Sequence, residues 1–409
     1  MAEVGYSRRR FLTGLGVGAG AGAAALATGT PLAHGMGREQ AAEAQDAQSI
    51  GDGTVAFDGR HQAGISTPEQ AAMWMLAFTL KPGLDRSRVR GFMRTWTDDA
   101  RRMSRGQPAI AELEPEMIAT PSDLTFTVGF GPRFFDVIGL PEQRPEWLAP
   151  LPKYSLDQLE EKWGDGDVVM QICCNDPMTL SHVARYMIRN AEPFADVHWV
   201  QTGFAHGAGV HEPGATPRNR FGQLDGTVNP RSTDELDDIV WINDGPKWLI
   251  GGTSMVVRRI HMEIETWEIL DRVSREESTG RHLASGAPLG MDHEHDVVDL
   301  DRRDSYGLPV IDANSHVARS MPADGKPGLQ VLRRPYTYDI PPTDGVTPDT
   351  GLVFISFQKD PLEQYHPIQQ RLDDSDRLNE WIRHIGSAVF VIPPGTTSDG
   401  YWGEDLLAE

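Results

Sequence analysis

The sequence predicts an α+β protein built from two similar, sheet-bearing halves. Short apolar runs of strand length alternate with stretches of helical length, and the connections between them suit antiparallel strands. Hydrophobic residues make up 39% of the 409 residues and aromatic residues 8%, so the chain has enough apolar side chains for a substantial core. Predicted elements begin near residue 54 and continue almost to the C-terminus.

The first half contains apolar runs that predict strands and intervening segments that predict helices. The strands are expected at residues 74–80, 124–130, 168–174 and 194–204, and the helices at residues 87–101 and 177–190. A loop rich in proline and glutamate separates the second predicted strand from the third.

The second half shows the same kinds of element. Residues 253–267 are strand-like, with Met255, Val257 and Ile260 among their apolar side chains. Residues 294–311 are predicted to form a loop. The remaining expected elements are strands at residues 329–338, 352–358 and 388–392, and a helix within residues 363–383.

Charge and cysteine content exclude several classes of function. The net charge of −21 argues against binding to nucleic acid, because a polyanion would be repelled. It favours neutral or cationic small substrates, although an acidic surface also serves solubility. The only cysteines, Cys173 and Cys174, are adjacent, so two buried thiols in a strand are expected rather than a strained ring. Two cysteines are too few for thiolate zinc or iron–sulfur sites.

The N-terminus has the pattern of an export signal. Arg8, Arg9 and Arg10 precede a glycine- and alanine-rich apolar stretch that ends near Thr28, which is typical of twin-arginine (Tat) signals. A transmembrane anchor is the alternative, but the many glycines suit it poorly. We therefore predict a signal peptide at residues 1–33, with cleavage as late as residue 44, and a flexible lead-in at residues 34–52. The exported protein would be periplasmic or extracellular.

Three polar landmarks in the second half suggest redox chemistry. Asp225-Gly226 lies in a loop-like segment, His316 is isolated, and Arg333-Arg334 follows a short segment later. An Asp-Gly pair alone is usually a turn. A carboxylate, an imidazole and a fixed cation together are what a haem peroxidase needs: an axial ligand on one face of the iron and an acid/base group with a cation on the other.

With these landmarks the chain resembles the dye-decolourising peroxidases, most closely their Tat-exported branch, which includes deferrochelatase-type proteins. The resemblance runs from about Phe57 to Leu407, and its central signature is Gly222-Gln-Leu-Asp225-Gly226. The other matching segments are residues 57–68, 127–132, 279–289, 293–296, 332–334 and 378–381.

The resemblance implies a fold and a function. Two ferredoxin-like halves, residues 53–212 and 213–409, would form the dimeric α+β barrel-like fold of these haem peroxidases, and the C-terminal half would hold one haem b per chain. Hydrogen peroxide would oxidise the haem to a ferryl state, and phenolic or dye-like aromatic donors would return the electrons. The partners expected are these molecules and the Tat export machinery, and a homodimer is compatible with the family. The alternative is a deferrochelatase-type protein of iron acquisition that releases iron from haem.

The resemblance also implies roles for single residues. His316 would be the proximal iron ligand, Asp225 the distal acid/base and Arg333 the distal cation, whereas strand alternation sends Arg334 to the opposite face, toward a propionate or solvent. Glu380 would bond the far nitrogen of His316, with a solvent-facing glutamate as the alternative. The chain departs from the family at residues 321–323, where Met-Pro-Ala replaces a frequent Asn-Pro-Arg and a propionate contact is weakened.

Two further groups of residues are expected around the haem. Leu352 and Phe354 would narrow the distal pocket, with ordinary core packing as the alternative. The expected cofactor contacts are Gly226, Thr227, Val228, Arg281, Met321, Arg333, Leu352 and Phe354. Because a narrow pocket excludes bulky dyes, electrons would enter through surface aromatic residues, for which the candidates are Trp381, Trp402, Tyr336 and Tyr401.

Overall fold

The computed structural model describes residues 51–212, 214–321, 330–342 and 348–408. The predicted signal peptide and nearly all of the predicted lead-in lie outside the described residues. Within the described ranges, no helix is both long and apolar enough to cross a membrane.

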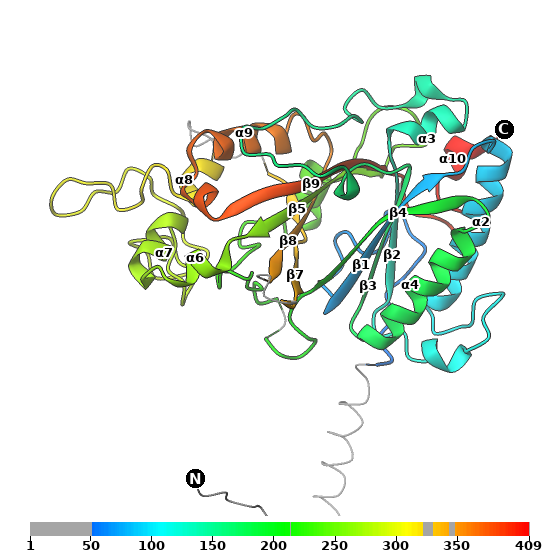
Figure 1. The fold of residues 1–409 in the computed structure, drawn as a ribbon, viewed down its shortest axis with the longest axis horizontal. Helices are drawn as coiled ribbons and strands as arrows, with labels where there is room; N and C mark the ends of the chain where they lie inside the picture. The colour runs from blue at the N-terminus through cyan, green and yellow to red at the C-terminus, as the bar shows by residue number, and fades with distance from the viewer. Residues whose placement is uncertain (1–50, 213, 322–329, 343–347, 409) are drawn as a thin grey trace, which may run out of the picture. The chain divides into compact units, whose positions relative to one another are not determined.

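The first half is an antiparallel sheet flanked by two long helices. The sheet order is β2-β3-β1-β4, which is the strand order of a ferredoxin-like unit. The elements are β1 (Ala72–Leu80), α2 (Arg86–Met103), β2 (Thr125–Phe130), β3 (Val168–Cys174), α4 (Pro177–Ala191) and β4 (Ala195–Phe204). Figure 1 shows α2 and α4 beside these strands, and α4 contacts β1 and β3.

Helix α2 illustrates how the sequence produces these elements. The Asp85 carboxylate accepts a hydrogen bond from the backbone N–H of Arg88 and so caps the first turn. Val89, Phe92 and Trp96 recur at helical spacing and are buried toward the sheet. The helix is therefore held by one apolar face and a capped start.

The second half repeats the same strand order. Its main strands are arranged β9-β5-β8-β7, and the two-residue strand β6 also pairs with β8. The elements are β5 (Thr253–Met262), α6 (Ile264–Glu268), α7 (Arg272–Thr279), α8 (His316–Ser320), β6 (Leu332–Arg333), β7 (Tyr336–Ile340), β8 (Asp349–Gln358), α9 (Tyr365–Ser375), the 3-10 helix η4 (Arg377–Glu380) and β9 (Ile382–Ile392). Figure 1 shows α6 to α9 grouped beside these strands.

Short helices complete the described part of the chain. They are α3 (Pro132–Val137), α5 (Thr233–Ile239), α10 (Glu404–Leu407) and the 3-10 helices η1 (Pro115–Ile118), η2 (Pro141–Gln143) and η3 (Glu161–Trp163).

The two halves share one closed antiparallel sheet. β2 pairs with β9 at Phe130 and Val391, and β4 pairs with β7 at Phe204 and Thr337. Because β5 also pairs with β8, the main strands described here form a continuous ring. Alternate side chains of each strand therefore face either the inside of the ring or the helices outside it.

Strand β1 shows this alternation. Met73 and Met75 pack inside the ring with Met255 of β5, whereas Leu76 and Phe78 pack on the side of the helices. Both faces of the strand are largely buried, and all of its residues except Thr79 are correspondingly apolar. The hydrophobic core thus has two layers separated by the sheet.

The predicted α+β architecture with two ferredoxin-like halves is confirmed, with corrections to several elements. The strand expected at residues 253–267 ends at Met262, and the chain then forms α6. The strand expected at residues 329–338 is divided into β6 and β7, because Pro335 lies between them and cannot donate a backbone hydrogen bond. The last strand begins at Ile382, six residues before its predicted start. Cys173 and Cys174 are buried free thiols in β3.

A buried ion pair links a loop of the first half to the sheet of the second. Arg258 on β5 is fully buried and contacts the carboxylate of Asp157, which is also buried. The Nε and Nη1 atoms of Arg258 have no hydrogen-bond partner among the described residues. The carboxylate of Asp157 is therefore the main group that stabilises the buried positive charge of Arg258. Loss of one member of such a pair leaves an isolated charge in the core.

We predict that Asp157→Ala lowers the free energy of unfolding by about 3–5 kcal/mol, because it leaves the Arg258 guanidinium uncompensated. Urea unfolding followed by circular dichroism measures this loss. Asp196→Ala is the control, since Asp196 forms an exposed pair with Lys81 at 3.5 Å, and it should cost about 1 kcal/mol or less. Equal losses in the two variants would show that Asp157 does not stabilise the buried charge.

Candidate active site

The Asp225 loop is shaped by its own polar residues. The side-chain oxygen of Asn219 accepts hydrogen bonds from the backbone N–H groups of Phe221 (3.0 Å) and Gln223 (3.2 Å). The backbone N–H of Asp225 donates to the carbonyl of Pro217 at 2.8 Å. Gly226 follows with φ of 121°, a conformation that a residue with a Cβ rarely adopts. The Asp-Gly turn thus fixes the backbone that carries Asp225.

Asp225 and Arg333 form an ion pair. Oδ1 of Asp225 lies 2.9 Å from Nη1 of Arg333, and the two side chains expose 13% and 23% of their surface. The other carboxylate oxygen of Asp225 accepts a longer hydrogen bond of 3.4 Å from the side-chain amide of Asn219. The structure therefore brings the predicted acid/base residue and the predicted cation into direct contact.

Asn229 holds this pair together and was missed from the sequence. Its side-chain amide donates to the carbonyl of Arg333 at 2.7 Å and accepts from the N–H of Arg333 at 3.0 Å. These two bonds attach the Asp225 loop to β6 in a fixed register. The only sequence signal was its position four residues after Asp225.

Arg334 lies on the opposite side of its neighbour, as strand alternation predicts. Its guanidinium contacts the carbonyl groups of Thr67 and Pro68 and the side chain of Gln70 in the first half. It is almost fully buried. The expectation that Arg334 faces a propionate or solvent is wrong, because these contacts enclose the guanidinium.

His316 is the first residue of α8 and is held from behind by a carboxylate. Ser315 caps this short helix by accepting from the N–H of Ala318. Nδ1 of His316 lies 2.6 Å from Oδ2 of Asp376, whose side chain is 1% exposed. The imidazole itself keeps 30% of its surface accessible, and its Nε2 has no hydrogen-bond partner within the described ranges. This arrangement orients the ring and presents Nε2 to a ligand.

The partner of His316 is Asp376 rather than the predicted Glu380. Asp376 caps η4, because its Oδ1 accepts the N–H of Leu378 at 2.9 Å while its Oδ2 bonds His316. Glu380 lies at the other end of η4 and is exposed. The prediction placed the correct type of group on the wrong residue of this turn.

The pKa of His316 depends on charged groups on both sides of the site, Asp376 on one side and Arg333 and Asp225 on the other. Burial lowers the pKa of His316, but the charge and hydrogen bond of Asp376 raise it, and the net pKa lies above the usual value. Arg333 lowers this pKa further and Asp225 raises it, so both act on the imidazole through space. A carboxylate-supported imidazole near a carboxylate–guanidinium pair is a set of groups that fits a haem iron.

Several predicted cofactor contacts lie in the loops beside this set. Thr227 donates to the carboxylate of Glu294 at 3.0 Å, and the next residue, Val228, is exposed. Arg281 donates through one nitrogen to the carbonyl groups of Gly286 (2.6 Å) and Glu294 (2.9 Å). Burial lowers the pKa of Arg281, and the nearby Arg333 lowers it further. Arg281 therefore organises the adjacent loop and lies near the cation of the site.

The other predicted contacts lie on α8 and β8. Met321 ends α8 and is half-buried. Leu352 lies beside Asp225 in the wall of a small pocket, whereas Phe354 packs against the ring of Tyr365 at 5.8 Å. Of the two β8 side chains, the structure brings only Leu352 to Asp225, and Phe354 shows the core packing that was its alternative.

The pocket at Asp225 is narrow. Its volume of about 20 Å³ is the space of one water molecule. Glu69, Asn219, Asp225 and Leu352 are among its lining residues, and Phe204, which is 48% exposed at the end of β4, also belongs to its wall. The pocket therefore runs from Asp225 toward the surface.

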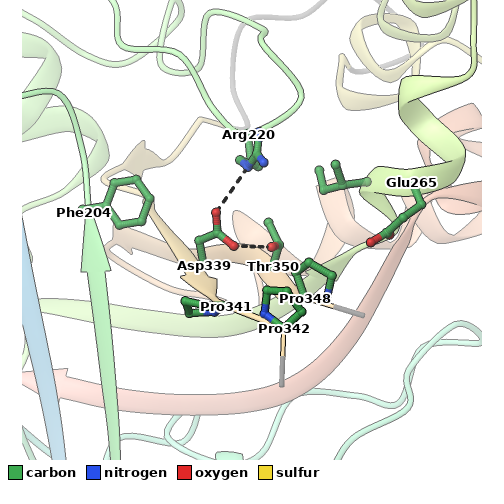
Figure 2. A pocket seen from close by; sticks show the side chains of 9 residues that line it. Phe204, Arg220, Glu265, Asp339, Pro341, Pro342, Pro348 and Thr350 are labelled. Atoms are coloured by element: carbon green, nitrogen blue, oxygen red, sulfur yellow. Dashed lines mark hydrogen bonds and ion pairs between the residues drawn. The ribbon is translucent and has the colours of Figure 1, made fainter. Parts of the chain in front are cut away.

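A second, larger pocket shares Phe204 with the first. It has a volume of about 460 Å³, and Figure 2 shows Arg220 opposite Asp339 and Glu265 on the far side. Nε of Arg220 lies 3.8 Å from Asp339, which also accepts a hydrogen bond of 2.6 Å from Thr350. Its apolar wall consists of Phe204, Ile264, Pro341, Pro342 and Pro348.

A group of aromatic side chains connects α6 with the Asp225 loop. Trp267 follows Ile264 by three residues on α6 and is buried. Its ring stacks on Phe221 with centroids 4.4 Å apart and meets the ring of Trp381 edge-on at 5.3 Å. Trp381 is partly exposed. Trp267 was not among the residues selected from the sequence.

The structure corrects the other candidate surface aromatic residues. Trp402, Tyr401 and Tyr336 each expose 5% of their surface or less. They pack in the core, so none of them presents a ring to a bulky donor. Trp381 is the one residue of the four candidates that reaches solvent.

Comparisons with known proteins identify the family of this chain. The family model for the N-terminal part of Dyp-type peroxidases matches residues 62–205, and the model for the C-terminal part matches residues 216–397. A dye-decolorizing peroxidase of Thermobifida fusca is 36% identical, and a deferrochelatase of Shigella flexneri is 32% identical. Each of these alignments covers 98% of this chain and 97% of the relative.

A solved structure is similar as well. The crystal structure of a DyP-type peroxidase from Cellulomonas bogoriensis has a TM-score of 0.85 and 44% identity, and the match covers 88% of this chain and 99% of the other. The chain belongs to the Dyp-type peroxidase family and is a haem-binding peroxidase.

Proposed function

We propose that this peroxidase uses hydrogen peroxide to oxidise phenolic or dye-like aromatic donors, with Asp225 as the acid/base, Arg333 as the distal cation and His316 as the iron ligand. The observation that carries this proposal is the ion pair of Asp225 and Arg333 beside an imidazole supported by a buried carboxylate. Haem, when bound, supplies the iron that peroxide oxidises and that donors reduce again.

Asp225 and Arg333 have complementary tasks in this proposal. The Asp225 carboxylate accepts a proton from one oxygen of peroxide and returns it to the other, which leaves as water. The Arg333 guanidinium favours the peroxide anion and the negative charge that develops on the departing oxygen. Asn229 keeps the two groups in register, so neither must be repositioned during the reaction.

Asp376 positions the ligand in this proposal. Its carboxylate accepts the Nδ1–H of His316, which leaves Nε2 as the ligating nitrogen. A carboxylate in this position also makes the imidazole more basic and so tunes the iron. The exposed Glu380 takes no part.

The donor binds away from Asp225. A space of about 20 Å³ does not admit an aromatic ring, whereas 460 Å³ falls in the size range of small-molecule sites. In the larger pocket, Phe204 and the prolines offer apolar contacts, and Arg220 offers a cation for acidic substituents (Figure 2). Trp267 and Trp381 then conduct electrons from the donor toward the Asp225 loop.

We also propose export by the twin-arginine pathway, which the consecutive Arg8 and Arg9 before an apolar, glycine-rich stretch support. The protein would then act in the periplasm or outside the cell. Replacement of both arginines by lysine should retain the protein in the cytoplasm of its host, and cell fractionation measures this. Unchanged export of the double variant would exclude the pathway.

Release of iron from haem is the second candidate, because a deferrochelatase is among the similar proteins. The two activities give different products from the same haem-loaded protein. Repeated peroxide-dependent oxidation of a dye by each haem supports the peroxidase role. Stoichiometric appearance of intact metal-free porphyrin would instead support iron release.

We predict that His316→Ala abolishes stable haem binding, because it removes the axial bond to the protein. Asp376→Asn should weaken haem affinity or activity by roughly 10–100-fold, as is usual when the partner of a ligating histidine is changed. Titration of the apoprotein with haem, followed by absorption, measures both effects. Glu380→Gln is the control and should bind like the parent. A stronger effect of Glu380→Gln than of Asp376→Asn would contradict the assignment of Asp376.

Arg333→Leu should slow the reaction with peroxide by roughly 100–1,000-fold, because a fixed positive charge is lost where negative charge develops. Asp225→Asn should cost less, since water partly replaces a proton shuttle. Stopped-flow absorption of haem-loaded protein gives both rates. Arg102→Leu on α2 removes the same charge far from the site and should be silent. A greater loss in Asp225→Asn than in Arg333→Leu would reverse the proposed ranking.

Trp381→Phe and Trp267→Phe should slow dye oxidation several-fold and leave the peroxide step unchanged, because the relay is damaged but the Asp225 pocket is intact. Steady-state dye oxidation and stopped-flow peroxide rates separate the two effects. Tyr306→Phe is a matched control, since Tyr306 is an exposed aromatic residue in a distant loop. If both tryptophan variants oxidise dye at the parental rate, donors do not react through this aromatic group.

A further inference from the structure

Glu69 is a carboxyl group that the proposed chemistry has not used. It lies between Pro68 and Gln70, two residues that contact the buried Arg334. Its Oε1 is inaccessible to solvent and has no hydrogen-bond partner in the part of the chain that the structure describes. Glu69 and Asp225 line the same small pocket.

The surroundings of Glu69 favour its neutral form. Burial raises the pKa of Glu69 to about 7, Arg334 opposes this shift, and the charge of Asp225 adds to it. Cys173 and Tyr336 also face Glu69, and burial raises the pKa of both, so they remain uncharged. A carboxyl group with such a raised pKa is suited to donate a proton.

The shared pocket offers a path between the two carboxyl groups. Its volume of about 20 Å³ holds one water molecule, and Arg218, Asn219 and Thr337 in its wall provide polar groups around that position. Glu69 and Asp225 both belong to the wall around that space. The exposed Phe204 in the same wall marks the end that opens toward solvent.

We propose that Glu69 is a positioning residue that delivers protons from solvent through one water molecule to Asp225. The proposal rests on the peroxidase function argued above. In each transfer the O–H bond of Glu69 breaks as the water gains a proton, and the water passes one of its own protons to the Asp225 carboxylate. The Glu69 carboxylate then regains a proton from solvent at the open end of the pocket.

The stoichiometry of the reaction requires such a route. Reduction of one hydrogen peroxide molecule to two waters consumes two protons and two electrons. The donors supply the electrons, and on oxidation they release their own protons in the larger pocket of Figure 2. Those protons do not follow electrons through Trp267, so the Asp225 side needs its own supply. Glu69 lies where that supply would enter.

A purely structural role as counter-ion of Arg334 fits the contacts less well. Arg334 directs its two terminal nitrogen atoms to two carbonyl groups and to Gln70, whereas its Nε has no hydrogen-bond partner among the described residues. Arg334 acts on Glu69 through its charge, but no ion pair joins the two side chains within the described ranges. A structural carboxylate in a buried site would be bonded to its cation. Glu69 is instead among the residues that line the Asp225 pocket.

The test compares haem-loaded Glu69→Gln, Glu69→Asp and parent protein. Glu69→Gln should lower kcat with a small phenolic donor roughly tenfold at mildly acidic pH, because the proton donor is lost and only water replaces it. The inflection of kcat near pH 7 should disappear with it. The rate constant for peroxide should change by less than about twofold, since Asp225 and Arg333 are intact. Glu69→Asp, which keeps a titratable group, should retain an inflection.

A second measurement needs no turnover. Infrared difference spectra recorded against pH should show a carboxylic-acid band in the parent that disappears as the pH passes neutrality. Glu69→Gln should lack this band. Glu142→Gln, which removes an exposed carboxylate on η2, is the control and should resemble the parent in both experiments.

Three results would overturn the relay. The first is a pH profile of Glu69→Gln that matches the parent. The second is equal loss of kcat in Glu69→Gln and Glu69→Asp together with lower melting temperatures, which indicates a packing role. The third is the absence of the titrating band from the parent. Failure of the parent to react with peroxide would refute the proposed function instead, and the infrared titration would still report whether Glu69 exchanges its proton.

Discussion

The ion pair of Asp225 and Arg333 is the contact on which the rest of the site depends, and the closed sheet makes it possible. Asp225 lies in the connection that leaves the first half, and Arg333 lies on β6, which pairs with β8 of the second half. The two hydrogen bonds from Asn229 to the backbone of Arg333 set the distance between them. A carboxylate and a guanidinium separated by more than one hundred residues therefore meet with little freedom to move.

A second carboxylate supports the other side of the site in a similar way. One carboxylate oxygen of Asp376 caps η4 by accepting the N–H of Leu378, and the other oxygen bonds His316. The same side chain therefore stabilises the start of η4 and orients the imidazole. Both sides thus combine a local turn with one long-range hydrogen bond. Because both oxygens of the buried carboxylate accept hydrogen bonds, its burial costs little. A carboxylate without these partners in the same place would destabilise the fold.

Local sequence patterns predicted the parts of this structure that depend on neighbours in the chain. The Asp225-Gly226 turn and strands such as β3 follow from local composition, and the family resemblance identified His316 and Arg333. Long-range choices were not accessible in this way. Asp376 and Glu380 lie at opposite ends of η4, and only the long-range contact between the start of η4 and the start of α8 decides which carboxylate meets the imidazole.

The same limit applies to burial. Trp402 and Trp381 are equally plausible surface residues in the sequence, but tertiary packing buries the first and leaves the second partly exposed. Glu69 was not noticed because its neighbours along the chain are ordinary turn residues. Its importance comes from Asp225 and Arg334, which the fold brings to it from distant positions.

In the proposed function, the two pockets that share Phe204 separate donor oxidation from the reaction with peroxide. The larger pocket has the volume of a small-molecule site and includes Ile264 of α6 in its wall, whereas the smaller pocket has the space of one water molecule and includes Asp225 in its wall. Electrons tunnel through aromatic side chains, but protons need a chain of exchangeable groups. A reaction that takes electrons from the donor and protons from solvent must therefore provide two routes. In the proposed function Trp267, which stacks on Phe221, belongs to the electron route, and Glu69, in the wall of the Asp225 pocket, belongs to the proton route.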